Sequence, residues 1–108
     1  MANTFKLKTK ANVGVSTSHV YVVPSATTTV VIGVTHANTT GSSINVGVGV
    51  TRASTDDVKL MKNVPIPQGS SFEFMAGNKV VLETTDTLTA ESDVNNSLDV
   101  ALTIMEIT

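Results

Sequence analysis

The sequence predicts an all-β protein, a single antiparallel β-sandwich of about eight strands in a jelly-roll or immunoglobulin-like arrangement. Composition is the first reason: 17 Val, 17 Thr and 5 Ile make 39 β-branched residues among 108, against 6 Leu and 8 Ala. Such side chains favour strands. The second reason is an alternation of apolar and polar residues that recurs along nearly the whole chain. The third is spacing, because turn signals interrupt this alternation about every 8–12 residues, as in sandwiches and small barrels.

The length of 108 residues predicts one domain, residues 1–108. Within it, residues 1–10 are expected to form an edge strand or an arm that contacts a partner. No apolar run approaches the roughly 20 residues that a membrane-spanning helix needs. The first residues also lack the apolar stretch of a secretory signal. We therefore expect a protein that folds in a cytoplasm and has no membrane partner.

The first expected strand begins at Phe5. Phe5 and Leu7 alternate there with Lys6, Lys8 and Lys10, which gives the strand one apolar and one basic face. The basic face has two interpretations. It protects an exposed sheet edge against unwanted pairing, or it contacts a partner.

Three further strands are expected in the first half of the chain. Residues 19–23 form one, and Pro24 ends it because proline has no amide hydrogen for the ladder. Residues 27–37 are apolar or small on both faces, which is typical of a central strand. Residues 44–51 carry Gly47 and Gly49 on one face, which indicates a bend, a bulge or the close approach of another backbone or chain.

The second half of the chain continues the pattern. Residues 58–64 alternate up to a corner built by Pro65 and Pro67. Residues 72–75, 80–82 and 87–92 are short strands between turns, and residues 98–105 show the cleanest alternation. Val and Ile are expected to face inward, with Thr, Ser and Asn outward or in turns.

Residue types that serve catalysis or metal binding are present, but no pattern joins them. His19 and His36 lack an Asp, Glu or second His at i±2, the spacing that places two ligands on one strand face. Both are expected to be exposed or hydrogen-bonded strand residues. No G-x-S-x-G elbow presents a serine as a nucleophile. Two pairs of carboxylates are close in sequence, Asp56 with Asp57 and Glu91 with Asp93, but neither continues with the ligand spacing of a calcium loop. We expect no enzyme, no catalytic residue, no metal and no cofactor or small-molecule substrate.

Charge is distributed unevenly along the chain. Residues 1–55 carry four cations and no carboxylate, for +4, whereas residues 56–108 carry three lysines and nine carboxylates, for 3 − 9 = −6. This asymmetry indicates either a contact between the basic part of one copy and the acidic part of another, or a first half that uses Thr, Ser and Asn where the second uses acids. Four cations without a second basic cluster fall short of a nucleic-acid surface.

Several segments along the chain form recognisable motifs: MANTFKLKTK at residues 1–10, YVVPS and VVIG at 21–25 and 30–33, VPIPQGSS at 64–71, KVVLE at 79–83, DVAL at 99–102 and EIT at 106–108. In these segments the chain resembles small virion structural proteins of tailed bacteriophages, notably those of marine and cyanobacterial hosts. The resemblance spans nearly the whole chain and rests on packing and turn motifs. It implies a compact β-sandwich present in many copies on a particle, as a capsid decoration or a neck or tail component. It carries no catalytic residues.

The leading prediction is a non-enzymatic virion protein that self-associates and docks on the capsid surface or on the neck and tail assembly. Its partners are copies of itself and other virion proteins such as the major capsid protein, and its location is the virion, assembled in the host cytoplasm. Phe5, Lys6, Lys8 and Lys10 are the residues expected to contact a partner. The alternative is a host-surface or carbohydrate-binding β-sandwich module of a tail or fibre.

Overall fold

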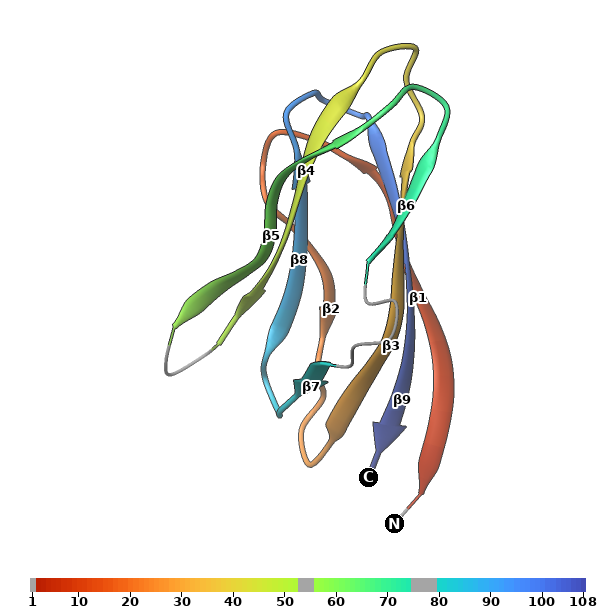
Figure 1. Cartoon of the computed structure of the whole chain (residues 1–108). Helices are drawn as coiled ribbons and strands as arrows, with labels where there is room; N and C mark the ends of the chain where they lie inside the picture. Colours follow the sequence, from red (N-terminus) through yellow and green to blue (C-terminus); the bar gives the residue numbers. More distant parts are fainter. Residues whose placement is uncertain (1, 53–55, 75–79) are drawn as a thin grey trace.

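Two antiparallel sheets pack face to face in a β-sandwich (Figure 1). The computed structural model describes residues 2–52, 56–74 and 80–108. Sheet 1 has the order β1 (Asn3–Val13), β9 (Leu98–Ile107), β3 (Thr28–Asn38), with β6 (Ser71–Phe74) and β7 (Val80–Leu82) both pairing with β3. Sheet 2 has the order β2 (Ser18–Val22), β8 (Thr87–Ser92), β4 (Ile44–Thr51), β5 (Asp57–Ile66). In the described part of the chain, no helix is long and apolar enough to cross a membrane.

The strand order is that of a jelly roll. β6 and β7 occupy one position beside β3, so four strand positions face four. Consecutive strands β1 and β2 lie in different sheets, whereas the first two strands of an immunoglobulin domain share one sheet. The expectation of an antiparallel sandwich is confirmed, and of its two forms the jelly roll is the one observed.

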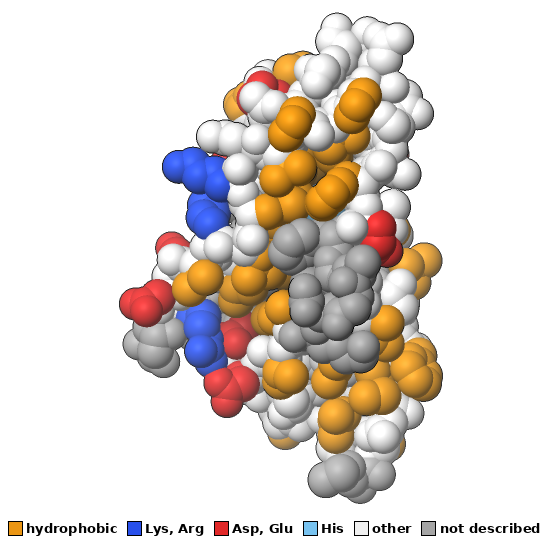
Figure 2. Space-filling view, in the orientation of Figure 1, with side chains coloured by type: hydrophobic (Ala, Val, Ile, Leu, Met, Phe, Trp, Pro, Cys, Tyr) orange, Lys and Arg blue, Asp and Glu red, His pale blue; other side chains and the backbone are white. Residues whose placement is uncertain are grey.

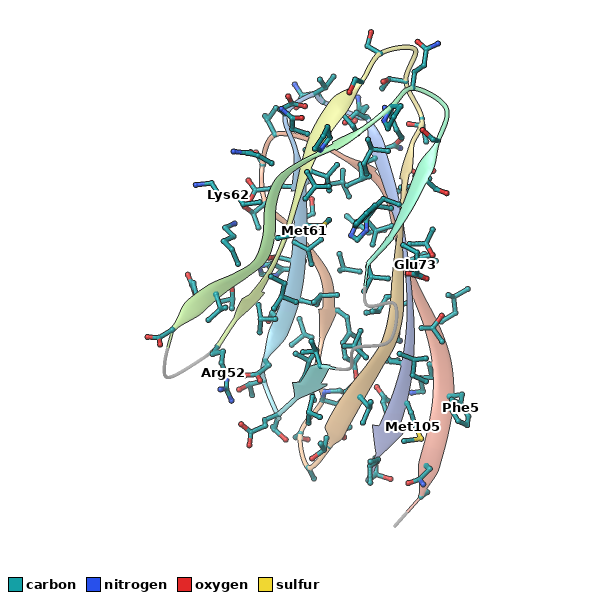
Figure 3. The ribbon with its side chains drawn as sticks, viewed as in Figure 1. Phe5, Arg52, Met61, Lys62, Glu73 and Met105 are labelled. Carbon is teal, nitrogen blue, oxygen red and sulfur yellow. The ribbon has the colours of Figure 1, made fainter. Side chains whose placement is uncertain are left out.

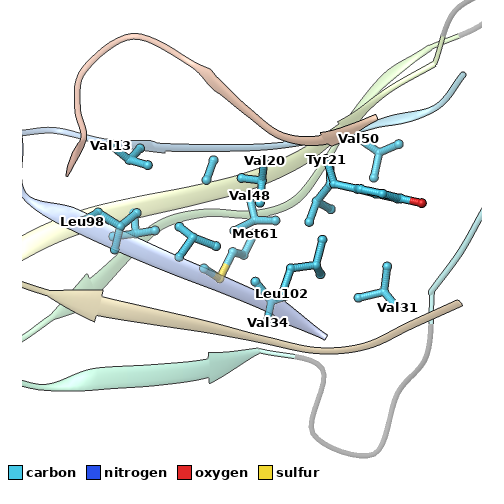
Figure 4. Close-up of a cluster of buried hydrophobic side chains, with 14 of the residues drawn as sticks. Val13, Val20, Tyr21, Val31, Val34, Val48, Val50, Met61, Leu98 and Leu102 are labelled. Carbon is cyan, nitrogen blue, oxygen red and sulfur yellow. The ribbon is translucent and has the colours of Figure 1, made fainter. Parts of the chain in front are cut away.

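The core lies between the sheets and consists mainly of Val, Leu and Ile (Figure 4). Val13, Leu98, Leu102 and Ile104 are completely buried. With one Tyr, three Phe and no Trp in the sequence, branched aliphatic side chains supply most of the packing. Burying each such side chain contributes roughly 1.5–3 kcal/mol.

Sheet position explains two departures from the expected strand boundaries. β5 continues through Pro65 to Ile66, because β5 is an edge strand of sheet 2 and proline is tolerated there. A bulge between β4 and β5 also breaks the expected alternation of β5, so Met61 is buried while Val58 is 44% exposed. β3 lies inside sheet 1, as a strand with two apolar faces predicts.

The same irregular pairing requires a glycine at position 49 of β4 but not at position 47. A Cβ on Gly49 would lie 2.9 Å from the Val58 carbonyl oxygen and 3.3 Å from Thr89 Oγ1. A Cβ on Gly47 would lie 3.5 Å from the Met61 carbonyl oxygen, an ordinary contact. Of the interpretations that the sequence left open, the structure shows a bulge and a close backbone approach, both within this chain.

The expected division into inward Val and Ile and outward Thr, Ser and Asn holds for much of the core and fails at particular residues in both directions. Seven of the buried polar residues are of these outward types: Thr27, Thr29, Asn38, Thr87, Thr89, Ser92 and Ser97. Asn38 shows how such burial is satisfied, because its Nδ2 donates to the carbonyl oxygens of Ser42, Ile66 and Pro67. In the opposite direction, Val15 and Val81 are each more than half exposed.

Candidate interaction surface

Strand β1 lies at an edge of sheet 1, and its register decides which of its faces is free. Lys6, Lys8 and Lys10 pair with Ile104, Leu102 and Val100, whose side chains are buried in the core. Directly paired residues of antiparallel strands point to the same face of a sheet. The three lysines therefore lie on the inner side of β1, and Phe5 and Leu7 lie on its outer side.

The outer face of sheet 1 is apolar near the end of β1 that carries Phe5. Phe5 pairs with Met105, which pairs in turn with Val30, and Val30 pairs with Val81. Phe5 is 71% exposed and Val81 is 58% exposed. Figure 3 shows the side chains of Phe5 and Met105 near each other beside β1, and hydrophobic side chains are visible along the lower right margin of Figure 2. One apolar row thus crosses all four strand positions of the sheet.

A bulge in β3 widens this surface. The register shifts between Val31 and Gly33, so Val31 and Val34 are both buried although they are three residues apart. Strict alternation would have placed one of them outside. Ile32 and Gly33 are left half-buried between them.

A shallow groove lies on the same outer face, toward the opposite end of β1 from Phe5. Its volume is about 250 Å³. Small side chains form its floor, namely Ala11 from β1, Ala101 from β9 and Ala37 from β3. Asp99 of β9, which pairs with Ala37, also lines the groove, and its Oδ1 accepts a hydrogen bond from the backbone N–H of Asn12 at 3.0 Å. The groove exists because small side chains occupy neighbouring rows of the sheet: Ala101 pairs with Thr9 and Thr35 in one row, and Ala37 pairs with Asp99 in the next.

The inner side of β1 ends in a polar cluster that ties the two sheets together. Lys6 Nζ lies 2.8 Å from Glu106 Oε1, and the Tyr21 hydroxyl donates to Glu106 Oε2 at 2.5 Å. The same hydroxyl lies 2.8 Å from Thr29 Oγ1. The hydrogen bonds from Lys6 and then Tyr21 lower the pKa of Glu106, and Lys8 adds to this effect through its charge. Burial and the bond to Glu106 raise the pKa of Tyr21 to about 12.

A second ion cluster closes one end of sheet 2. Arg52 Nε lies 3.2 Å from Asp86 Oδ1, and its Nη2 also pairs with Glu83. Asp86 is buried, and its Oδ2 accepts from the backbone N–H of Glu83 at 2.9 Å. Like Lys6, Arg52 is a cation of the first half that pairs with carboxylates of the second half. Part of the charge asymmetry between the two halves of the sequence is therefore neutralised by ion pairs within one copy of the chain.

His36 contradicts the expectation of an exposed or hydrogen-bonded residue. Its side chain is completely buried on the inner face of β3, and neither ring nitrogen has a hydrogen-bond partner among the described residues. Burial lowers the pKa of His36 to about 4. The ring is therefore neutral at pH 7. His19 is exposed.

A polar recess of about 370 Å³ lies on sheet 2, away from the apolar face. Asn45, Asn63, Glu91 and Asp93 line it, with the backbone of Gly47 at its floor. Asp93 Oδ1 accepts from the backbone N–H of Asn45, and Glu91 Oε1 lies 2.6 Å from Lys59 Nζ. In the part of the chain that the structure describes, no group of three His, Cys, Asp or Glu is arranged to hold a metal ion.

The structure divides the four residues expected to contact a partner. Phe5 lies on the apolar outer face, whereas Lys6, Lys8 and Lys10 project from the inner side of the same strand. Lys6 is already paired with Glu106. The sequence reasoning missed the alanines of the groove, although Ala11 continues the spacing of Phe5 and Leu7 at every second residue.

No protein-family model matches the sequence, and no curated protein matches it. The fold is similar to that of a solved structure whose description reads "Bacillus endospore appendages form a novel family of disulfide-linked pili". The match covers 99% of this chain and 87% of that chain, with a TM-score of 0.59 and 11% sequence identity. At this identity, the likeness shows a shared fold.

Proposed function

We propose that this chain is a non-enzymatic structural protein that works by self-association, with many copies on a larger particle. The observation that carries the proposal is the apolar outer face of sheet 1, where Phe5 and Leu7 are 71% and 64% exposed. Contiguous apolar surface on a soluble protein marks a site of interaction. The face continues to the edge strand β1, whose backbone offers further contacts to a neighbouring strand.

The structural neighbour supports self-association of this kind. Its description states that Bacillus endospore appendages form a family of disulfide-linked pili. The present chain has the same fold but no cysteine. Copies of this chain would therefore be held together without disulfides, by apolar burial and backbone hydrogen bonds.

The finer form of the proposal is a role in a bacteriophage virion. The resemblance of residues 1–10, 64–71 and 99–102 to small virion proteins supports it. The chain would decorate the capsid surface or belong to the neck or tail, with itself and other virion proteins such as the major capsid protein as partners. It would be located in the virion after assembly in the host cytoplasm.

Mass in solution tests the proposal most directly. Light scattering over a range of concentrations should give a mass above that of the 11.3 kDa monomer. The protein should also rebind purified particles from which small proteins have been stripped. A monomer at every concentration that does not bind particles would overturn the proposal.

The predicted contact of the basic residues needs point substitutions in place of a deletion. Removing residues 1–10 would remove the β1 neighbour of β9 along most of its length and leave β9 paired with β3 alone. Reversing Lys8 and Lys10 to Glu keeps the strand and changes its charge. If these lysines contact the particle, the double variant should rebind it less well than Lys62→Glu, an exposed lysine of β5. Equal rebinding of the two variants would remove Lys8 and Lys10 from the contact.

A host-surface or carbohydrate-binding module is the second candidate, and the polar recess of sheet 2 favours it. Amides and carboxylates such as Asn63 and Asp93 suit the hydroxyl groups of a sugar. Tyr21 is buried and unable to act as a stacking platform for a sugar ring. A glycan-array signal lost in Asn63→Ala would favour this candidate, and an array without signal would count against it.

A further inference from the structure

We propose that the outer face of sheet 1 binds the same face of a second copy about a twofold axis, with Phe5 of each copy seated in the groove of the other. This inference rests on the proposed self-association and assigns the surface and geometry of one contact. The face carries both parts of such a contact, because Phe5 projects from one end of β1 and the groove lies toward the other end.

The spacing of these two features suits a closed pair. Phe5 is five residues from Lys10, the middle of the β1 segment that lines the groove, which is roughly 16 Å along a strand. A twofold axis that lies between the faces and runs across the strands near Leu7 reverses the strand direction of the second copy. Each Phe5 then lies over the groove of its partner. Such an interface uses one patch twice and closes at two copies.

The groove is large enough for the ring. Its volume of about 250 Å³ exceeds the roughly 150 Å³ of an engineered apolar cavity that binds benzene. Ala11, Ala37 and Ala101 leave the floor low without requiring any side chain to move. A phenyl ring in this position would exchange water for contact with the three alanines and with the side chains of Thr9 and Thr35.

The low charge of the face also favours a second copy of the same face as the partner. Among the outward positions of the described strands β1, β9 and β3, Asp99 is the single charged residue, and it already accepts a hydrogen bond from Asn12. Glu73 of β6 also has a partner, because its Oε1 accepts from Thr35 Oγ1 at 3.3 Å. The lysines of β1 lie on the other side of the strand. Pairing two such faces therefore buries no unpaired cation. A nucleic acid or an acidic partner would need a cation on this face, and the described outward positions provide none.

The area is sufficient for a specific but modest contact. Four strand positions about 4.8 Å apart and some ten residues of about 3.3 Å give a flat footprint of roughly 600 Å² per copy. Two copies together would bury about 1,200 Å², the lower end of standard interfaces. We therefore expect a dimer whose population depends on concentration.

Two substitutions test the two halves of the contact. Phe5→Ser removes the projecting ring, and Ala101→Ile fills the groove with a side chain that suits a strand. Val22→Ser, at a half-exposed valine of sheet 2, is the matched control. Sedimentation velocity over a concentration series should show dimerisation at least tenfold weaker for the first two variants and unchanged for the control. Circular dichroism and melting temperature confirm that each variant is folded.

An experiment that mixes the two variants tests the pairing most directly. Neither variant alone can make a ring-in-groove contact, but the Ala101→Ile copy still has Phe5 and the Phe5→Ser copy still has its groove. The mixture should dimerise more strongly than either variant alone. Equal association of the mixture and its components, or wild-type growth beyond two copies through this face, would overturn the twofold pairing.

The outcomes also separate this inference from the proposed function. A wild-type protein that forms oligomers unaffected by Phe5→Ser and Ala101→Ile would reject this interface and leave self-association standing. A wild-type monomer that ignores particles would reject both.

Discussion

Lys6 Nζ lies 2.8 Å from Glu106 Oε1, so the first strand of the chain is joined to the last by a charged contact on the inner side of sheet 1. Glu106 is only 5% exposed, and it also accepts the hydrogen bond of Tyr21 from sheet 2. This carboxylate therefore links both sheets where both chain ends meet. The two ends are joined again by backbone hydrogen bonds between Ala2 and Thr108.

Removal of this carboxylate should destabilise the fold. Glu106→Ala leaves Lys6 and the Tyr21 hydroxyl without their acceptor. Hydrogen bonds to charged groups contribute about 1.5–3 kcal/mol, so urea unfolding should show a loss of about 2 kcal/mol. Asp56→Ala, at an exposed carboxylate, should change stability by less than about 0.5 kcal/mol. Equal losses in the two variants would show that Glu106 does not link the sheets energetically.

Acid should destabilise the protein below pH 6.5 through His36. Its pKa is about 4 in the fold and 6.5 when unfolded, so between these values the unfolded chain binds more protons and stability falls as the pH falls. The loss should reach about 3 kcal/mol at pH 4. The depressed pKa of Glu106 adds a further loss of the same sign below its ordinary range.

His36→Leu isolates the histidine contribution. The leucine removes two buried ring nitrogens that have no partner among the described residues, so stability at pH 7 should be equal or higher. When thermal unfolding is measured from pH 7 to pH 4, the melting temperature of this variant should change much less with pH above pH 4.5 than that of the wild type. An unchanged slope would place the acid sensitivity elsewhere.

Alkali should act on Tyr21 in the opposite direction. Its pKa is about 12 in the fold and about 10 when unfolded, so stability is complete below pH 10 and declines as the pH rises toward 12. Because the chain has one tyrosine, ultraviolet absorbance reports this ionisation without overlap from a second tyrosine. A native-state titration midpoint near pH 10 would contradict the buried bond to Glu106.

The bulge of sheet 2 should make Gly49 intolerant of a side chain. In Gly49→Ala the new Cβ would meet the Val58 carbonyl oxygen at 2.9 Å, and relief requires a backbone shift. The expected cost is about 1–3 kcal/mol in urea unfolding. Gly41→Ala is the control, because nothing lies within 4 Å of a Cβ there and no positive φ is required. Its stability should be unchanged or slightly higher.

The sandwich itself could be predicted from the sequence, because strand propensity and period-two alternation are local properties. Residues 98–105 alternate so regularly that the inward set of β9, Leu98, Val100, Leu102 and Ile104, is correct as predicted. Where bulges interrupt pairing, as in β3 and β5, the alternation predicts the wrong face, because a single extra residue reverses every side chain beyond it.

The candidate surface shows the limit of such reasoning most clearly. The sequence by itself determined that β1 has an apolar face with Phe5 and a basic face with Lys6, Lys8 and Lys10. Only the tertiary structure decided that the basic face points inward, toward Glu106, and that the apolar face points outward. Alternation is symmetric under exchange of the two faces, so the choice depends on which strand pairs with β1 and in which register. The same pairing brings Ala11, Ala37 and Ala101 together from three distant segments into one groove.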